Sequence, residues 1–62
     1  MDNSRDVEIT VTLSSEDAWA VSEFIKRAGF DDYRRLAVDD KQARDMISGF
    51  SDIREALDKE GV

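Results

Sequence analysis

Two pairs of carboxylates flank a short basic and aromatic cluster in the middle of the chain. The pairs are Asp31-Asp32 and Asp39-Asp40, and the cluster is Tyr33-Arg34-Arg35. Adjacent carboxylates can bind divalent cations, but neither pair has the spacing of a calcium loop, and both stand where helices need N-caps. We therefore interpret them as capping residues and predict no metal site.

The guanidinium groups of Arg34 and Arg35 could hold a carboxylate or a phosphate through paired hydrogen bonds. Alternatively, they form ion pairs with the neighbouring Asp side chains on the same surface or across a dimer. We favour the ion pairs, and we keep Tyr33, Arg34 and Arg35 as candidate contacts for a partner.

The composition argues against catalysis. The chain has 62 residues and contains neither His nor Cys. It therefore lacks the usual general bases near neutral pH, nucleophilic thiolates and zinc ligands. Because no spacing supports a pair of catalytic carboxylates either, we predict that the protein is not an enzyme and uses no cofactor.

The charge balance favours a protein as the partner. Fifteen acidic and nine basic residues give a net charge of −6, which disfavours binding to nucleic acid or to an anionic membrane. No apolar run has the length of a membrane span, and the N-terminus has neither the basic start nor the apolar middle of a secretory signal. We expect a cytoplasmic protein.

The first element that must position these residues is a predicted strand. Residues 7–13 alternate strictly between apolar and polar, which is typical of a half-buried strand. We expect residues 1–6 to be disordered and residues 7–62 to form a single domain. The apolar face of the strand consists of Val7, Ile9, Val11 and Leu13.

Helices are predicted after the strand. One begins at the Ser14-Ser15 caps and runs to about Ala28, with Gly29 in the left-handed conformation at its end. A short helix or a pair of turns follows over residues 31–38. The last helix begins at Asp39 or Asp40 and runs to about Glu60, and Gly61 ends it in the same way. Its apolar stripe consists of Ala43, Met46, Ile47, Phe50, Ile53 and Leu57.

A single strand cannot satisfy its own backbone donors and acceptors. We therefore predict an α+β fold, mostly helical, in the order β-α-α with a short intervening helix. The strand would pair with its copy in a homodimer, as an antiparallel ribbon. The alternative is a monomer whose open strand edge could dock a foreign strand.

Trp19 is the main candidate for an anchor on the first helix. The apolar residues Val21, Phe24, Ile25 and Ala28 define the direction that the helix buries. Trp19 points away from it, beside Ser22, Glu23 and Lys26. Because Trp is enriched at binding hot spots, Trp19 and Glu23 join the candidate partner contacts. The alternative is that Tyr33 or Leu36 covers Trp19.

Residues 7–29 resemble the first half of ribbon-helix-helix repressors. In such proteins the outward side chains of the ribbon enter the major groove of DNA. The corresponding residues here are Glu8, Thr10 and Thr12, and the acidic charge disfavours phosphate contact. A regulator of this kind remains an alternative function, as does a purely structural dimerisation module.

A second resemblance extends from about Ile9 to Gly61. The residues that carry it are Ala18-Trp19, Phe24-Ile25-Lys26-Arg27, Gly29-Phe30, Asp32-Tyr33-Arg34, Leu36-Ala37-Val38-Asp39-Asp40 and Arg54-Glu55-Ala56-Leu57. They are similar to an uncharacterised family of proteobacterial prophage and plasmid proteins of similar length. The resemblance implies a mobile element and supplies no site residue. We expect an acidic factor that binds a host protein or complex, such as a CRISPR interference complex.

Overall fold

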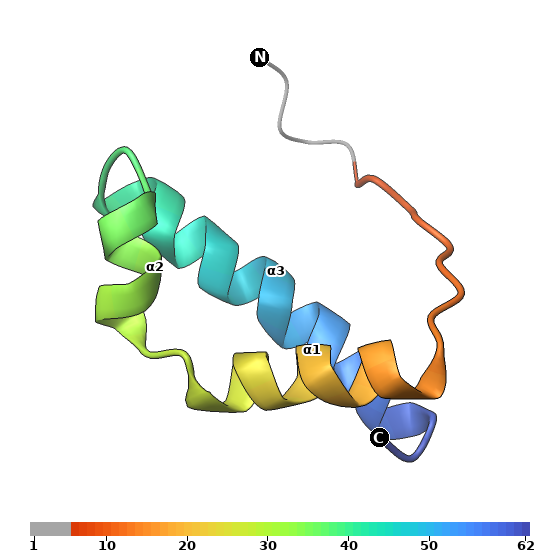
Figure 1. The fold of residues 1–62 in the computed structure, drawn as a ribbon. Helices are drawn as coiled ribbons and strands as arrows, with labels where there is room; N and C mark the ends of the chain where they lie inside the picture. Colours follow the sequence, from red (N-terminus) through yellow and green to blue (C-terminus); the bar gives the residue numbers. More distant parts are fainter. Residues whose placement is uncertain (1–5) are drawn as a thin grey trace.

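The computed structural model describes residues 6–62, and three helices account for most of them. These are α1 (Ser15–Arg27), α2 (Phe30–Leu36) and α3 (Asp40–Lys59). The long helix α3 packs against both α1 and α2. Figure 1 shows α2 at one end of the molecule, while the start of α1 and the end of α3 lie at the other.

The predicted strand is wrong, and so is the β-α-α fold with its antiparallel ribbon. Residues 6–62 contain no strand. Residues 6–14, here termed the N-terminal arm, run as an irregular segment into α1 (Figure 1). Val7, Ile9 and Val11 are 85%, 67% and 67% exposed. A strand needs a neighbour to share its backbone hydrogen bonds, and the alternating pattern of the arm did not supply one.

The loss of the ribbon also removes the premise of the ribbon-helix-helix alternative, because that family reads DNA with a paired strand. Of the expected disordered segment, residues 1–5 lie outside the described part of the chain. No helix in residues 6–62 combines the length and the apolar character that a bilayer span requires.

The first helix begins as predicted and ends differently. The Ser14 Oγ accepts a hydrogen bond from the Asp17 N–H at 3.0 Å, which caps α1. Gly29, expected to be left-handed, has a φ of −105° and is instead the N-cap of α2. Its N–H donates to the Asp32 Oδ2 at 2.8 Å. The turn after α1 therefore opens the next helix directly, without a left-handed ending.

Both predicted ends of α3 are confirmed. The Asp39 Oδ1 accepts from the Gln42 N–H at 2.8 Å at the start of the helix. At its end Gly61 is left-handed, with a φ of 83°. The Val62 N–H donates to the Leu57 carbonyl at 3.1 Å, and the Gly61 N–H donates to the Asp58 carbonyl at 3.0 Å. This pair of bonds is a Schellman motif.

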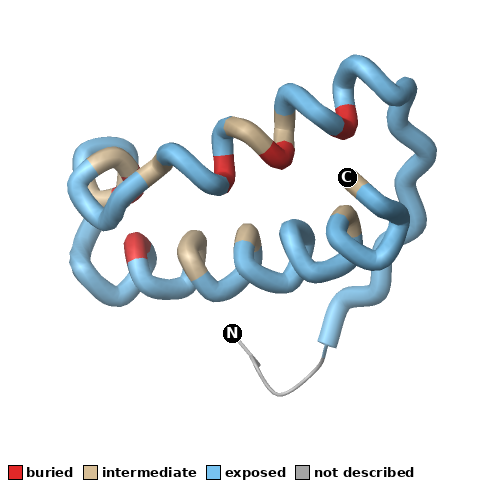
Figure 2. The backbone as a smooth tube through the Cα atoms, turned by 90° about the horizontal axis from the view of Figure 1, so that it is seen from below, coloured by how far each residue is buried: buried red, intermediate tan, exposed pale blue. Residues whose placement is uncertain are grey.

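The core is small and differs from the predicted one on α1. Figure 2 shows buried positions along one side of α1 and at single places on α2 and α3. The buried residues of the described chain are Ala18, Ser22, Ile25, Tyr33 and Ala43. On α3, the predicted stripe faces inward at Met46, Ile47, Phe50 and Leu57, which are partly buried, whereas Ile53 is exposed.

The face of α1 that is buried in the structure differs from the face predicted from the sequence. Ser22, placed on the polar side by sequence, is fully buried, while Phe24, placed in the core, is 53% exposed. Ala18 and Ser22 are small and lie one helical turn apart, so they allow a close approach of α1 to its neighbour. The Ser22 Oγ has no hydrogen-bond partner within residues 6–62. The face of α1 with small residues therefore packs inward, and the ring of Phe24 remains about half exposed.

Gly49 offers a direct test of local stability. It lies inside α3, and a Cβ built there would meet no atom within 4 Å. Gly in a helix interior costs about 0.5–1 kcal/mol relative to Ala. Gly49→Ala should therefore raise the free energy of unfolding by about that amount, measured by urea denaturation. The matched control is Gly61→Ala, which should lower it because position 61 is left-handed. A decrease for Gly49→Ala would contradict this account.

Candidate functional site

An open apolar groove of about 790 Å³ lies between the C-terminal half of α1, the helix α2 and the middle of α3. Such a volume is in the range of known ligand pockets, about 300–1,000 Å³. The apolar part of its lining consists of Ala20, Phe24, Ala28, Tyr33, Leu36, Met46 and Phe50. Each helix contributes to the groove, so it exists only in the folded chain.

Three aromatic rings, one from each helix, form a cluster in this groove. The ring centroids of Phe24 and Tyr33 are 6.4 Å apart, and those of Phe24 and Phe50 are 5.9 Å apart, both edge to face. Tyr33 and Phe50 are 5.7 Å apart in a tilted arrangement. All three distances are within the range of favourable aromatic pairs. The cluster joins the helices and still presents the half-exposed face of Phe24 to solvent.

The charged rim of the groove is electrically balanced. The Arg27 Nη2 lies 2.7 Å from the Glu23 Oε1, and the Arg35 Nη1 lies 3.8 Å from the Asp32 Oδ1. All four groups line the groove. These side chains are largely exposed, so each pair contributes little to stability, and the rim has no net charge.

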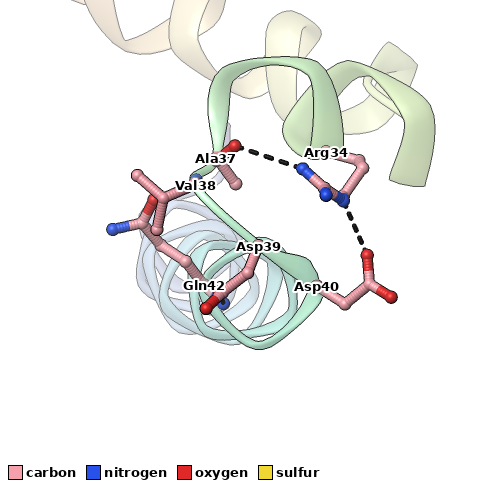
Figure 3. Close-up of polar contacts among 6 residues, drawn as sticks. All are labelled: Arg34, Ala37, Val38, Asp39, Asp40 and Gln42. Carbon is pink, nitrogen blue, oxygen red and sulfur yellow. Dashed lines mark hydrogen bonds and ion pairs between the residues drawn. The ribbon is translucent and has the colours of Figure 1, made fainter.

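Arg34 stabilises the turn between α2 and α3 (Figure 3). Its Nε donates to the Asp40 Oδ1 at 2.6 Å, and its Nη1 donates to the Ala37 carbonyl at 3.2 Å. In the same turn the Val38 N–H donates to the Gln42 Oε1 at 2.8 Å. The guanidinium of Arg34 is therefore committed to contacts within the chain.

The structure brings some of the predicted partner contacts together and separates others. Glu23, Tyr33 and Arg35 all line the groove. Tyr33 lies in its buried floor, whereas Glu23 and Arg35 are on the rim. Arg34 lies in the turn described above. Trp19 is outside the lining and is 47% exposed, so the middle segment does not cover it.

Sequence reasoning missed Phe24, Phe50 and Leu36 as residues of the groove. It assigned Phe24 and Phe50 to a closed core, because their spacing on each helix is that of a buried stripe. The short length of the chain could have indicated this, since a small domain cannot bury all of its aromatic rings.

One member of each predicted carboxylate pair caps a helix. Asp32 and Asp39 accept hydrogen bonds from backbone N–H groups at the starts of α2 and α3. Asp40 pairs with Arg34. In the described residues no three acidic side chains lie close enough together to hold a metal ion.

The negative charge of the chain is concentrated at one end of the molecule. Residues 18–51 contain six acidic and six basic side chains, so they are neutral as a unit. Residues 6–17 contribute four acidic side chains and no basic one, and residues 52–60 contribute four acidic and two basic ones. The start of α1 and the end of α3 lie at the end of the molecule opposite α2, and the arm leaves from the same end (Figures 1 and 2).

We term this region, residues 6–17 and 52–60, the acidic end. Its two segments carry charges of −4 and −2, so it holds the whole net charge of −6. Residues 1–5 add one acidic and one basic side chain, whose charges cancel. The carboxylates of the acidic end on the helices are Glu16, Asp17, Asp52, Glu55 and Asp58, and Glu60 is the C-cap of α3.

The rest of the molecule, residues 18–51, is here termed the neutral end, and paired charges cancel locally in it. The Lys41 Nζ donates to the Asp45 Oδ2 at 2.8 Å. This hydrogen bond and the negative charge of Asp45 raise the pKa of Lys41 above its ordinary value, so Lys41 remains charged at neutral pH. The two ends of the molecule thus present different surfaces to a partner.

Comparison with known proteins identifies a family but no function. The model of a family described as "Family of unknown function (DUF7706)" matches residues 1–62. Neither a curated protein nor a solved structure matches the chain.

Proposed function

The chain belongs to this family of unknown function, DUF7706, over residues 1–62, and we propose that it is a small acidic protein-binding accessory factor of a phage or plasmid. Membership of the family assigns no activity. The proposal is supported by the surface chemistry of residues 6–62 and by the resemblance to prophage and plasmid proteins. Its partner is a host protein or complex with a basic surface.

The observation that carries the proposal is the acidic end. The net charge of −6 is confined to the start of α1, the end of α3 and the arm, while the rest of the molecule is balanced. A concentrated charge attracts a surface of opposite sign and accelerates association more than the same charge spread over the molecule. It also sets the orientation in which the protein meets that surface.

Trp19 supplies an apolar anchor close to the acidic end. It lies one turn after Glu16 on the same side of α1, and about half of its surface is exposed. Trp side chains often dominate binding energies when a partner buries them. Attraction by the carboxylates and burial of Trp19 would therefore act on the same contact.

A host-defence complex is the target that we would test first. Effector complexes of CRISPR interference hold nucleic acid in a positively charged channel. An acidic end about as wide as two helices could occupy such a channel and compete with nucleic acid. The protein would then inhibit interference without chemistry of its own.

The experiment is a pull-down from host lysate, followed by measurement of the affinity of the purified complex at increasing salt. Glu55→Gln combined with Asp58→Asn raises the net charge from −6 to −4 at the acidic end. This variant should bind its partner at least about 10-fold more weakly at low salt, because both the electrostatic steering and the charge complementarity between the two surfaces decrease. Trp19→Ala should weaken binding at every salt concentration.

The matched control is Asp31→Asn combined with Asp45→Asn, which changes the net charge equally at the neutral end. It should bind like the wild type. Equal losses in the two double variants would contradict a role for the acidic end. The absence of a stoichiometric protein partner, together with a clear nucleic acid shift, would overturn the proposal.

A further inference from the structure

The protein leaves two apolar surfaces uncovered, and they lie on different parts of the molecule. One is the N-terminal arm, whose four apolar side chains, Val7, Ile9, Val11 and Leu13, are all exposed. The other is the groove, where Phe24 and Leu36 are 53% and 76% exposed. Contiguous apolar surfaces of this kind mark contact sites in small soluble proteins.

The exposed area is larger than a single folded chain of this mass requires. A monomer of 7.0 kDa is expected to expose about 4,000 Å², whereas this chain exposes 5397 Å². The radius of gyration is 12.9 Å, against about 10.6 Å for a compact domain of this length. The excess of about 1,400 Å² includes the exposed arm, and it is large enough to supply the roughly 800 Å² that each partner buries in a standard protein interface.

The apolar pattern of the arm suits the apolar lining of the groove. Apolar side chains alternate along the arm with Glu8, Thr10 and Thr12. An extended segment with this pattern has one apolar face and one polar face. The groove is open on one side, so it would cover the apolar face and leave the polar face in water. A segment with apolar side chains on both faces would not fit such a groove.

Charge disfavours the arm at the acidic end and does not oppose it at the neutral end of the molecule. The arm carries Asp6 and Glu8 and no basic residue, so the acidic end would repel it. The rim of the groove is balanced, and its Arg27 and Arg35 are exposed cations that can also face the carboxylates of an incoming arm.

The position of the arm favours a second copy over the same chain. The arm leads into α1 at its first turn, at the acidic end, whereas the groove is formed by the other half of α1 together with α2 and the middle of α3 (Figure 1). Two chains related by a two-fold axis could exchange arms, so that the arm of each chain occupies the groove of the other. Each acidic end would then lie beside the neutral end of the other copy, which avoids contact between like charges.

We propose that the N-terminal arm of one copy occupies the groove of a second copy, and that this exchange forms a homodimer. The dimer does not use the antiparallel ribbon expected from the sequence, and it does not depend on a host partner. It covers the aromatic cluster and the apolar face of the arm, while the acidic side chains at the start of α1 and the end of α3 take no part in the contact.

The test is the mass of the full chain in solution, by light scattering and sedimentation equilibrium. The wild type should have a mass of about 14 kDa, twice that of the chain. Val11→Asp in the arm and Leu36→Asp in the groove should each raise the dimer dissociation constant about 100-fold or more, because each buries a charge. Both positions are exposed in the single chain, so helix content by circular dichroism should not change.

Each variant has a matched control that places the same charge nearby. Thr10→Asp is on the polar face of the arm, and Val38→Asp is at a residue that is 79% exposed and outside the groove lining. Both should remain dimeric. A mixture of Val11→Asp and Leu36→Asp should form a heterodimer, because one chain keeps an intact groove and the other keeps an intact arm.

Three results would overturn the proposal. A wild-type mass of 7.0 kDa at high concentration would show that no second copy binds. The second result is a monomeric wild type whose free energy of unfolding is lowered by both Val11→Asp and Leu36→Asp. This would indicate that the arm binds in the groove of its own chain. A dimer that survives both substitutions would assign the contact to another surface.

Discussion

Replacement of Tyr33 by alanine is expected to unfold the protein. Tyr33 is the one buried residue of α2, and its ring contacts Phe24 of α1 and Phe50 of α3. Removal of a buried aromatic ring costs about 3–5 kcal/mol, and a core in a chain of this size supplies roughly that much. Circular dichroism should show a large loss of helix at 25 °C, and urea titration should show no folded baseline.

The control for this prediction is Tyr33→Phe, which removes only the hydroxyl. It keeps both ring contacts, so its free energy of unfolding should lie within about 1 kcal/mol of the wild type. If Tyr33→Ala instead melted within a few degrees of the wild type, the aromatic cluster would not be the centre of the core.

Replacement of Phe50 by alanine should have the next largest effect. Phe50 lies on α3, and its ring is 5.9 Å from that of Phe24 and 5.7 Å from that of Tyr33. It is only partly buried, so we expect a loss of about 2–3 kcal/mol, below the value for a fully buried ring. Urea denaturation at a fixed protein concentration measures this loss.

Phe30→Ala is the matched control for Phe50→Ala, because Phe30 is a more exposed ring outside the cluster. It should cost less than about 1 kcal/mol. A double-mutant cycle between Phe24 and Phe50 should give a coupling of about 0.5–1.5 kcal/mol. A coupling of zero would mean that the two rings do not stabilise each other.

Sequence determined the start of α1 and both ends of α3 because these caps depend on nearby residues. Ser14 and Asp39 cap α1 and α3 through backbone groups three residues away, and Gly61 ends α3. The ion pairs of Arg34 and Arg35 with neighbouring Asp residues were also predicted correctly. Of the candidate contacts in the groove, Glu23, Tyr33 and Arg35 were identified from sequence, but not as one site.

Only the tertiary structure decided which surfaces meet. The alternation in residues 7–13 specified an apolar face, but a strand also needs a partner for its backbone, and the described chain supplies none. Ser22 is buried and Phe24 exposed because the approach of α1 to the rest of the fold depends on residues from distant parts of the chain. The acidic end arises in the same way. The start of α1 and residues 52–60 are far apart in sequence, and only the packing of α3 against α1 places these two acidic segments at the same end of the molecule.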